Sequence, residues 1–253
     1  MFFLGIISYI FAASLPDKCV DSGVICITFD DGPTGYTGEV LDMLEENNIK
    51  ATFHFTVQNI TRGNISGMMR RAIDEGHCVG IRLNPKRDYD QMEADDIKSD
   101  IDNQVKVMEG ELDRKIKFAR APVNDGEVNA DVYNALLEKG ITQTNYSYCF
   151  YYEADDSEDA TRQLKMVLNA SNPKYESFIF LLHDEKERDF PMLEDIIKYG
   201  KEKGYSFVTM DECLKGYDPK DMEKGRKGSR LSDSSGVDKL LMVPLCLLIF
   251  LLI

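Results

Sequence analysis

The sequence has no tryptophan and only three histidines in 253 residues. Without tryptophan, any aromatic binding surface has to be built from tyrosine and phenylalanine. Because histidine is the commonest metal ligand, a metal centre with several imidazoles could draw only on His54, His77 and His183. The chain also lacks a Cys-x-x-Cys pair and a spaced Cys/His set, which excludes a structural zinc site of the finger type.

Basic residues are scarce as well. The chain has 30 lysines and arginines against 44 aspartates and glutamates, which gives a formal net charge of −14. This charge argues against a nucleic-acid partner, since such partners are bound through clustered positive charge. An acidic surface would tolerate a neutral polysaccharide and attract a cationic one, although solubility alone also accounts for it.

Both ends of the chain are apolar. Residues 1–14 form an apolar run that ends in small residues, which predicts a signal peptide; a buried first strand is the alternative. Residues 240–253 form a second run, shorter than the about 20 residues of a membrane span. A polar linker at 220–239 precedes it, as in a glycosylphosphatidylinositol (GPI) signal, with a short tail anchor as the alternative. Three serines are candidate attachment sites: Ser229, Ser232 and Ser234.

These ends predict a secreted, GPI-anchored protein at the outer face of the plasma membrane or in the cell or spore wall, with residues 15–219 as its folded domain. Four glycosylation sequons fit that location: Asn59, Asn64, Asn145 and Asn169. Without the tail, an odd number of cysteines remains, so at least one thiol is free. Cys19 and Cys213 lie near opposite ends of the domain, and we expect them to form a disulfide if these ends meet.

Short apolar runs alternate with helical patterns through most of the chain. The runs are mostly continuous, as in parallel strands that are buried on both faces. The expected strands are 24–29, 51–57, 78–82, 116–120, 141–148, 177–182 and 205–210. The clearest helix is expected over 93–112, where apolar residues recur every three or four positions. This alternation predicts an α/β fold, an irregular (β/α) barrel of seven or eight parallel strands with its chemistry at the C-terminal strand ends.

Charged and titratable residues follow these expected strands. Asp30 and Asp31 come directly after the first strand. Three further residues end the third, fourth and sixth strands: Arg82, Arg120 and His183. Because the C-terminal ends of parallel strands share one rim of a barrel, we expect these five groups to lie together.

Four stretches of the chain resemble motifs of the NodB-type polysaccharide deacetylases, carbohydrate esterase family four, which includes the chitin deacetylases. Thr28–Pro33 is similar to the first motif and Phe178–Asp184 to the last. Gly76–Gly80 resembles the lead-in to the second motif, and Phe118–Pro122 resembles the third. The resemblance covers most of Val24–Leu214. It implies a NodB-homology barrel that hydrolyses an N-acetyl amide with the help of a zinc or cobalt ion.

The resemblance also implies a role for each matching residue. Asp30 would be the general base, His183 the general acid and Asp31 a metal ligand. Arg120 would orient Asp30, and the backbone N–H of Val123 would help to bind the oxyanion. Together these groups would supply an activated water, a polarised carbonyl and a protonated leaving amine, which amide hydrolysis needs.

The sequence departs from the family where the metal should be held. The second motif should read His-(Ser/Thr)-x-x-His, whereas residues 82–86 read Arg-Leu-Asn-Pro-Lys. Neither Arg82 nor Lys86 offers a lone pair at neutral pH, so Asp31 alone remains where a catalytic zinc needs about three protein ligands. Without the metal, the pKa of the attacking water would be higher by roughly nine units, on the order of 12 kcal/mol. We therefore expect no metal cofactor and no hydrolysis.

The third and fourth motifs are altered as well. Val123 and Asn124 replace the usual aromatic residue and glycine, and Asp155 and Asp156 lie in the fourth-motif region without its tryptophan. These changes affect the groove that would hold the sugar. Five aromatic residues could supply stacking rings or could be ordinary core residues: Tyr146, Tyr148, Phe150, Tyr151 and Tyr152.

Two hypotheses concern the place that the metal would have taken. His54 could face the barrel interior near Asp31 and join another metal site, although a hydrogen-bonded core histidine is the simpler interpretation. Alternatively, Arg82 or Lys86 could balance the adjacent carboxylates, which would otherwise repel each other. A salt bridge from Arg82 to Asp31 or Asp30 would be the sign of this second arrangement.

Three functions are compatible with these features. We expect a chitin deacetylase-like protein of the cell surface or wall that has lost hydrolysis, with chitin or a related N-acetylglucosamine polymer as a weak ligand. An active deacetylase with an unorthodox site is one alternative. A carbohydrate-binding protein without turnover is the other.

Overall fold

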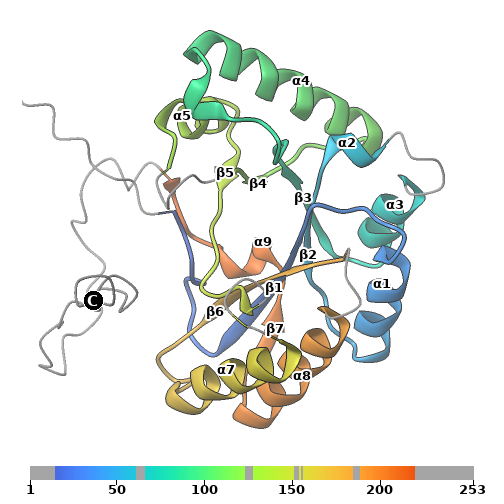
Figure 1. Ribbon diagram of the computed structural model, residues 1–253, viewed down its shortest axis with the longest axis vertical. Coiled ribbons are helices and arrows are strands. Elements are labelled where there is room, and N and C mark those ends of the chain that lie inside the picture. The colour runs from blue at the N-terminus through green and yellow to red at the C-terminus, as the bar shows by residue number, and fades with distance from the viewer. Residues whose placement is uncertain are drawn as a thin grey trace, which may run out of the picture. The chain divides into compact units, whose positions relative to one another are not determined.

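Seven parallel strands curl around the centre of the described part of the protein, and helices pack outside them (Figure 1). The computed structural model describes residues 15–60, 66–122, 128–150, 154, 156–184 and 189–219. Three segments expected from the sequence lie outside these residues: the signal peptide at 1–14, the linker at 220–239 and the tail at 240–253. No helix among the described residues is long and apolar enough to cross a membrane.

The strands form where continuous apolar runs were expected. They are β1 (Val24–Asp30), β2 (Thr52–Phe55), β3 (Cys78–Arg82), β4 (Phe118–Arg120), β5 (Thr142–Gln143), β6 (Phe178–His183) and β7 (Ser206–Val208). Their order in the sheet is β5-β4-β3-β2-β1-β6, and β7 pairs with the first half of β1. The predicted α/β fold with a curled, barrel-like parallel sheet is confirmed.

The strand expected over 141–148 is shorter than its apolar pattern suggested. Only Thr142 and Gln143 pair with β4. The backbone then turns away, because the N–H of Asn145 donates to the carbonyl of Pro16. Three residues later Tyr148 bridges Phe180 of β6 in parallel. This crossing segment connects β5 and β6, the two end strands of the sheet path.

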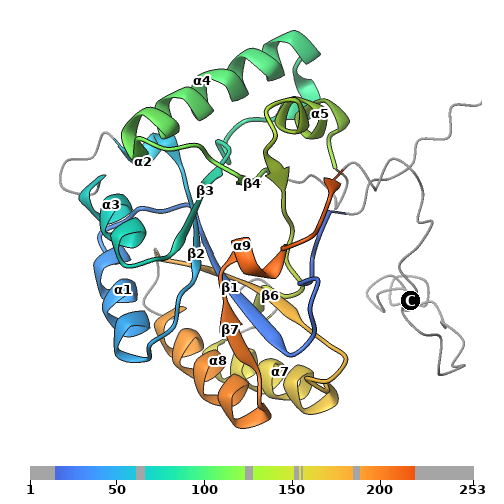
Figure 2. The same ribbon diagram turned by 180° about the vertical axis from the view of Figure 1, so that it is seen from behind.

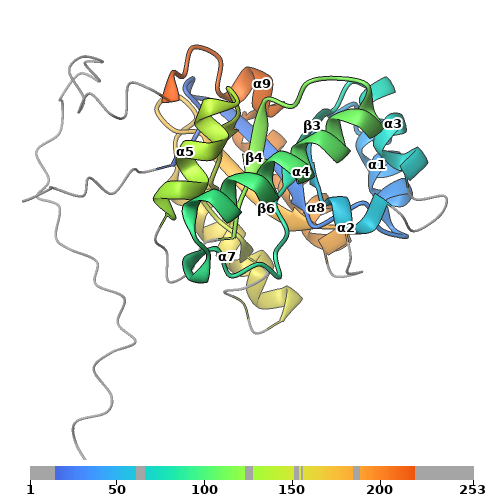
Figure 3. The ribbon, with the colours of Figure 1, turned by 90° about the horizontal axis from the view of Figure 1, so that it is seen from above.

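Helices cover the outside of the sheet. They are α1 (Thr37–Glu46), α2 (Val57–Ile60), α3 (Ser66–Asp74), α4 (Ala94–Leu112), α5 (Ala130–Glu138), α7 (Ser157–Ala170), α8 (Asp189–Lys203) and α9 (Met210–Cys213), with a short 3₁₀ turn η2 (Tyr89–Gln91). Figure 3 shows α4 and α5 lying outside β3 and β4. The predicted stripe of α4 is buried against the sheet: Ile97, Ile101, Val105, Met108 and Leu112.

Glycines end three of the helices. Gly76, Gly140 and Gly204 follow α3, α5 and α8 with φ values of +86°, +71° and +88°. A side chain at such a φ would crowd the backbone, so glycine is the residue that ends a helix in this conformation most easily. Each glycine therefore sets the point where the chain returns to the sheet.

A disulfide joins the first and last parts of the domain. Cys19 is bonded to Cys213 of α9, and the N–H of Val20 donates to the carbonyl of Cys213 at 2.8 Å. Figure 2 shows α9 across the end of the barrel opposite to the rim described below. There Cys213 packs with Cys26 and Cys78 in a small buried cluster. Burial raises the pKa of the Cys26 thiol to about 12, which makes this thiol unreactive.

His77 makes the stability of the fold sensitive to acid. The N–H of Ala51 donates to its Nδ1 at 3.0 Å, so this nitrogen has to stay unprotonated. Burial, with a contribution from the charge of Lys50, lowers the pKa of His77 to about 4. Because the unfolded chain binds this proton from about pH 6.5 downward, folding stability should fall as the pH drops from about 6.5 to about 4, by on the order of 3 kcal/mol.

Urea unfolding at pH 7 and pH 4.5 tests this expectation. His77→Gln can still accept the hydrogen bond from Ala51 but does not titrate, so the variant should lose less stability over this interval than the original chain. Equal losses in the two proteins would show that other groups cause the acid sensitivity.

Candidate functional site

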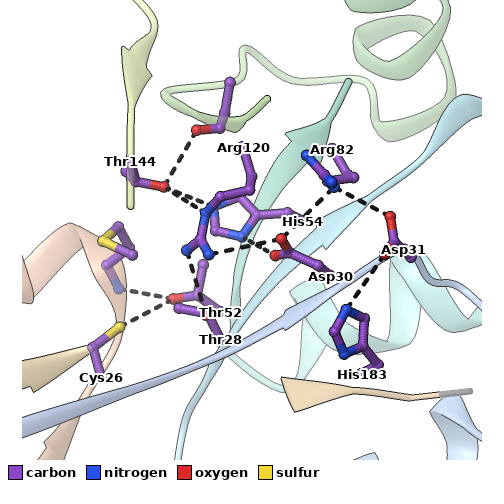
Figure 4. Close-up of polar contacts among 12 residues, drawn as sticks. Cys26, Thr28, Asp30, Asp31, Thr52, His54, Arg82, Arg120, Thr144 and His183 are labelled. Carbon is purple, nitrogen blue, oxygen red and sulfur yellow. Dashed lines mark hydrogen bonds and ion pairs between the residues drawn. The ribbon is translucent and has the colours of Figure 1, made fainter. Parts of the chain in front are cut away.

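Six polar side chains meet at the C-terminal ends of the strands: Asp30, Asp31, His54, Arg82, Arg120 and His183 (Figure 4). The register places Asp30 of β1 opposite His54 of β2 and His183 of β6. Arg82 of β3 lies opposite Arg120 of β4. The structure thus brings together the rim residues expected from the sequence, and it adds His54 to them.

Asp30 is the most enclosed carboxylate of this group, with 2% of its surface exposed. Its Oδ1 lies 3.1 Å from Nδ1 of His54. Its Oδ2 lies 3.7 Å from both Arg82 Nε and Arg120 Nη1. Burial opposes ionisation, but Arg120 above all, with His54 and Arg82, holds the pKa of Asp30 well below its ordinary value. Asp30 is therefore a strongly ionised carboxylate.

Asp31 occupies a tight turn directly after β1. Its φ of 67° is in the left-handed region, which an aspartate tolerates better than most residues. Arg82 Nε donates to its Oδ1 at 3.1 Å, and His183 Nε2 lies 3.4 Å from its Oδ2. The side chain is 23% exposed, so it stays within reach of solvent at the rim. Both of its carboxylate oxygens already face protein cations or donors.

The next residue, Gly32, leaves room for a buried carboxylate that holds this turn. A Cβ at Gly32 would lie 2.6 Å from Asp184 Oδ2. That same oxygen accepts a hydrogen bond from the hydroxyl of Thr37 on α1. Sequence reasoning gave Asp184 and Thr37 no role, although Asp184 stands next to His183 in the last motif. Asp184 is completely buried and holds the loop after β6 against the loop after β1.

Arg82, and not Lys86, balances the two carboxylates. The salt bridge from Arg82 to Asp31 that the second hypothesis requires is present, together with a longer contact to Asp30. Lys86 is exposed, and its one described hydrogen bond runs from its backbone N–H to Asn84 Oδ1. Lys86 is therefore outside the site, in contrast to the alternative that it fills the place of the metal.

The residues present do not fit a catalytic metal ion. Among the residues that the structure describes, no group of three or more His, Cys, Asp or Glu side chains could hold one. Zinc needs about three protein ligands, whereas Asp31 is held by Arg82 and His183. A metal here would have to displace a guanidinium from two carboxylates, which is unfavourable because the arginine would be left without its counter-ions.

His54 is a hydrogen-bonded core histidine, which was the simpler of the two interpretations. Its contact is with Asp30 and not with Asp31, and its Nε2 lies 3.5 Å from the hydroxyl of Thr144. Burial lowers the pKa of His54, so the ring is neutral. Gly80 on β3 makes room for it, since a Cβ there would lie 2.9 Å from His54 Cδ2. His54 therefore supports Asp30 from inside the barrel.

Arg120 reaches into the barrel interior below Asp30. Its Nε and Nη2 donate to the hydroxyls of Thr144 and Thr28, each at 3.4 Å. The ring of Tyr146 lies 5.3 Å from its guanidinium carbon, which is a cation–π contact. These contacts are compatible with the role of orienting Asp30 that the family resemblance implied.

The other aromatic candidates are core residues or lie outside the described part. The rings of Tyr148 and Phe150 stack with their centroids 5.5 Å apart and pack on β6. Tyr151 and Tyr152 are not among the described residues, and neither are three positions of the third and fourth motifs: Val123, Asn124 and Asp155. Of the described rings, Tyr146 is thus the one beside the site, while Asp156 caps α7.

His183 faces Asp31 from the end of β6. Burial disfavours its protonated form, but the hydrogen bond to Asp31 and the nearby charges of Asp30 and Asp31 outweigh this and raise the pKa of His183. A protonated His183 adds a second positive charge beside Asp31, which further reduces the affinity of this carboxylate for a metal ion.

Asn59, one of the four residues predicted to carry a glycan, lies beside the site in the folded protein. Its Nδ2, the atom that a glycan would occupy, donates to the backbone carbonyl of Asp31 at 2.8 Å. The residue is only 7% exposed. Asn59 therefore supports the Asp31 turn in the folded protein. Asn169 is exposed on α7 and Asn145 is partly buried, while Asn64 lies outside the described residues.

Comparison with known proteins shows which family this chain is similar to. Residues 17–144 match the family model for polysaccharide deacetylase. The chain is 30% identical over 200 residues to a bifunctional xylanase/deacetylase of Pseudobutyrivibrio xylanivorans, covering 78% of this chain but only 31% of that one. It is 29% identical over 208 residues to a chitin deacetylase of Colletotrichum lindemuthianum, covering 78% and 82% of the two chains.

The fold has close counterparts among solved structures. The chitin deacetylase of Colletotrichum lindemuthianum superposes with a TM-score of 0.72 at 25% identity, covering 81% of this chain and 93% of the other. A CE4 family pseudoenzyme from Bacillus anthracis superposes with a TM-score of 0.62 at 17% identity, covering 76% and 66%. At that identity the second likeness shows the fold alone.

Proposed function

Because the chain belongs to the polysaccharide deacetylase family, we propose that it is a chitin deacetylase-like protein that no longer hydrolyses its polymer. One observation carries this proposal: Arg82 donates to Asp31 from the position where the family's first metal-binding histidine is expected. A guanidinium cannot lower the pKa of a water by coordination. The attacking water would therefore remain a very weak nucleophile, with a pKa near 15.7 instead of about 7.

The state of Asp30 supports the same proposal. A general base works best when its pKa lies near the working pH, because it has to accept a proton during the reaction. Arg120, His54 and Arg82 together hold the pKa of Asp30 well below the ordinary value for aspartate. Without a metal-activated water, such a weak base removes a proton very slowly.

A location at the cell surface or in the wall completes the proposal. The apolar ends of the chain, with the GPI-type signal between 220 and 253, support secretion and lipid anchoring. The Cys19–Cys213 disulfide is compatible with an oxidising, extracytoplasmic compartment. The ligand would be chitin or a related N-acetylglucosamine polymer, by similarity to the chitin deacetylase of Colletotrichum lindemuthianum.

Acetate release from chitin oligosaccharides tests the loss of hydrolysis. We expect no acetate above background from the purified chain, whether zinc, cobalt or a chelator is added, because the described residues of the site include no group of three side chains that could hold a metal ion. The assay is validated in parallel with an active chitin deacetylase. Zinc- or cobalt-dependent release by this chain would overturn the proposal in favour of an active enzyme with an unorthodox site.

A double substitution tests whether the histidine positions alone account for the loss. Arg82→His with Lys86→His restores the histidine pair of the family, so the variant should bind zinc while the original chain does not. Isothermal titration with zinc chloride gives the comparison. A variant that binds no zinc would show that the neighbouring loop positions have also changed.

A further inference from the structure

Charge is distributed unevenly between the two ends of the barrel. Because the strands are parallel, the segments that lead into them lie at the end opposite to the rim, where α9 also lies; we call it the α9 end. Its segments are 15–23, 47–51, 75–77, 113–117, 139–141, 171–177, 203–205 and 209–219. They contain nine lysines and arginines and eight aspartates and glutamates, whereas the other described residues contain 12 and 26. The excess of acidic residues is therefore at the rim and on the helical sides, and the α9 end is close to neutral.

The α9 end also presents two exposed apolar side chains. Val20 and Tyr175 are 54% and 70% exposed. They stand on neighbouring segments, because the hydroxyl of Ser22 donates to the carbonyl of Lys174 at 3.0 Å. The Nζ of Lys174 lies 5.4 Å from the centroid of the Tyr175 ring. An exposed tyrosine beside a lysine suits the boundary between a membrane and water, where the ring meets lipid and the ammonium reaches the headgroups.

The described chain ends on the same side of the barrel. Figure 3 shows α9 at one end and α2, which follows the C-terminal end of β2, at the other, with the last described residues nearer to α9. The hydroxyl of Tyr133 donates to the carbonyl of Pro219 at 3.2 Å and holds this point on the domain. The candidate attachment serines, 229 to 234, follow Pro219 by 10 to 15 residues, at most about 35–55 Å of extended chain. Since a domain of this size is about 40 Å across, an anchor on these serines brings the α9 end to a membrane most easily.

We propose that the α9 end is a docking surface for a phospholipid membrane, on which Val20 and Tyr175 enter the boundary between headgroups and acyl chains. The proposal rests on the lipid anchor of the proposed function, which brings the chain to a membrane. Anionic lipids repel the acidic rim and sides of the barrel, whereas the near-neutral α9 end approaches the lipid surface without this repulsion. The site around Asp31 then faces away from the membrane.

The lack of tryptophan in the chain makes this orientation measurable. Tyr175→Trp and Lys86→Trp each introduce a single tryptophan, one at the α9 end and one in an exposed loop at the rim. The full chain of each variant is bound to vesicles of phosphatidylcholine and phosphatidylserine, with or without bromine on the acyl chains, because bromine quenches tryptophan on contact. Since an indole at the interface enters the lipid, brominated vesicles should reduce the emission of Tyr175→Trp at least about twofold and leave Lys86→Trp unchanged.

A second substitution separates the docking surface from the anchor. Val20→Glu in the Tyr175→Trp background replaces an apolar contact with a negative charge, so the quenching should fall by about half even though the anchor is unchanged. Its unfolding temperature should stay the same, because the side chain of Val20 is exposed. The matched control is Val107→Glu, which changes a similarly exposed valine on α4 and should leave the quenching as it is.

Equal quenching at the two tryptophan positions, quenching of Lys86→Trp alone, or quenching of neither would overturn the docking surface. An unchanged signal in Val20→Glu would overturn it as well. Sedimentation of the same vesicles separates this proposal from the proposed function. A chain that stays in the supernatant would contradict the membrane location and, with it, the docking surface. A chain that sediments without the expected quenching would contradict the docking surface alone.

Discussion

Replacing Arg120 with methionine is expected to lower the free energy of unfolding by about 3–5 kcal/mol at pH 7, because one partner of a buried ion pair is removed. Arg120 is 3% exposed, and its Nη1 lies 3.7 Å from Asp30 Oδ2. Methionine fills much of the same space without a charge. Asp30 would then stay ionised in the interior with only His54 and Arg82 to stabilise it.

The effect should depend on pH in a defined direction. In the original chain the pKa of Asp30 is lower in the folded state than the value of about 4 in the unfolded state. The ionised carboxylate therefore stabilises the fold above about pH 4. This stabilisation is lost as the pH falls from there towards the pKa of the folded state. In Arg120→Met the pKa of Asp30 should rise, because burial is no longer opposed to the same extent. Asp30 can then take up a proton, and the deficit of the variant should shrink between pH 7 and pH 5.

Urea unfolding of a double-mutant cycle provides the measurement. Asp30→Asn removes the buried charge, so Arg120→Met should cost less in that background than in the original chain. A deficit that is equal at both pH values and in both backgrounds would show that Arg120 stabilises the fold through packing and its threonine contacts, and not through its charge.

Breaking the disulfide is expected to have an effect of similar size. Cys19 and Cys213 are separated by 194 residues, so the bond greatly restricts the unfolded chain. Loop-closure entropy for this separation corresponds to about 5 kcal/mol, and native disulfides typically contribute about 2–5 kcal/mol. Cys213→Ser should therefore lower the unfolding temperature strongly, and a reductant should have the same effect on the original chain.

The local structure explains why this bond matters for the fold. Residues 15–20 attach to the barrel through the disulfide and through hydrogen bonds, among them the N–H of Asn145 to the Pro16 carbonyl and the N–H of Val20 to the Cys213 carbonyl. Cys26→Ser is the matched control, since Cys26 is buried but forms no disulfide. Its stability should respond to reductant as the original chain does. Unfolding temperatures unaffected by reductant in the original chain would contradict this prediction.

Local patterns were sufficient for most of the fold. Strand β3 has the bounds that its apolar run predicts, and α4 begins within one residue of the expected position. These elements depend on side-chain periodicity and on glycines such as Gly76, which act within a few residues. The prediction of one strand over 141–148 was wrong, because the backbone partners of this segment, Pro16 and β6, are distant in the sequence. No local pattern records such partners.

Asn59 shows the same limit for the site. Its sequon is a local signal, and nothing local indicated that its amide donates to the backbone carbonyl of Asp31. Nothing local marked Asp184 either as the carboxylate that accepts the hydrogen bond of Thr37 and fills the space left by Gly32. In both cases burial against another part of the chain decides the contacts of the side chain.

The sequence by itself determined the family, the gathering of five charged or titratable residues at one rim of the barrel, and the replacement of the family's two metal-binding histidines by Arg82 and Lys86. These follow from residue types at fixed positions. The tertiary structure alone decided that Arg82 and not Lys86 neutralises Asp31, and that His54 supports Asp30. The reason is geometric: Arg82 ends β3 and is held by the register of the sheet, while Lys86 lies four residues beyond it in an exposed loop. Which cation meets which carboxylate depends on that register and on burial, because strands far apart in the sequence supply the two partners.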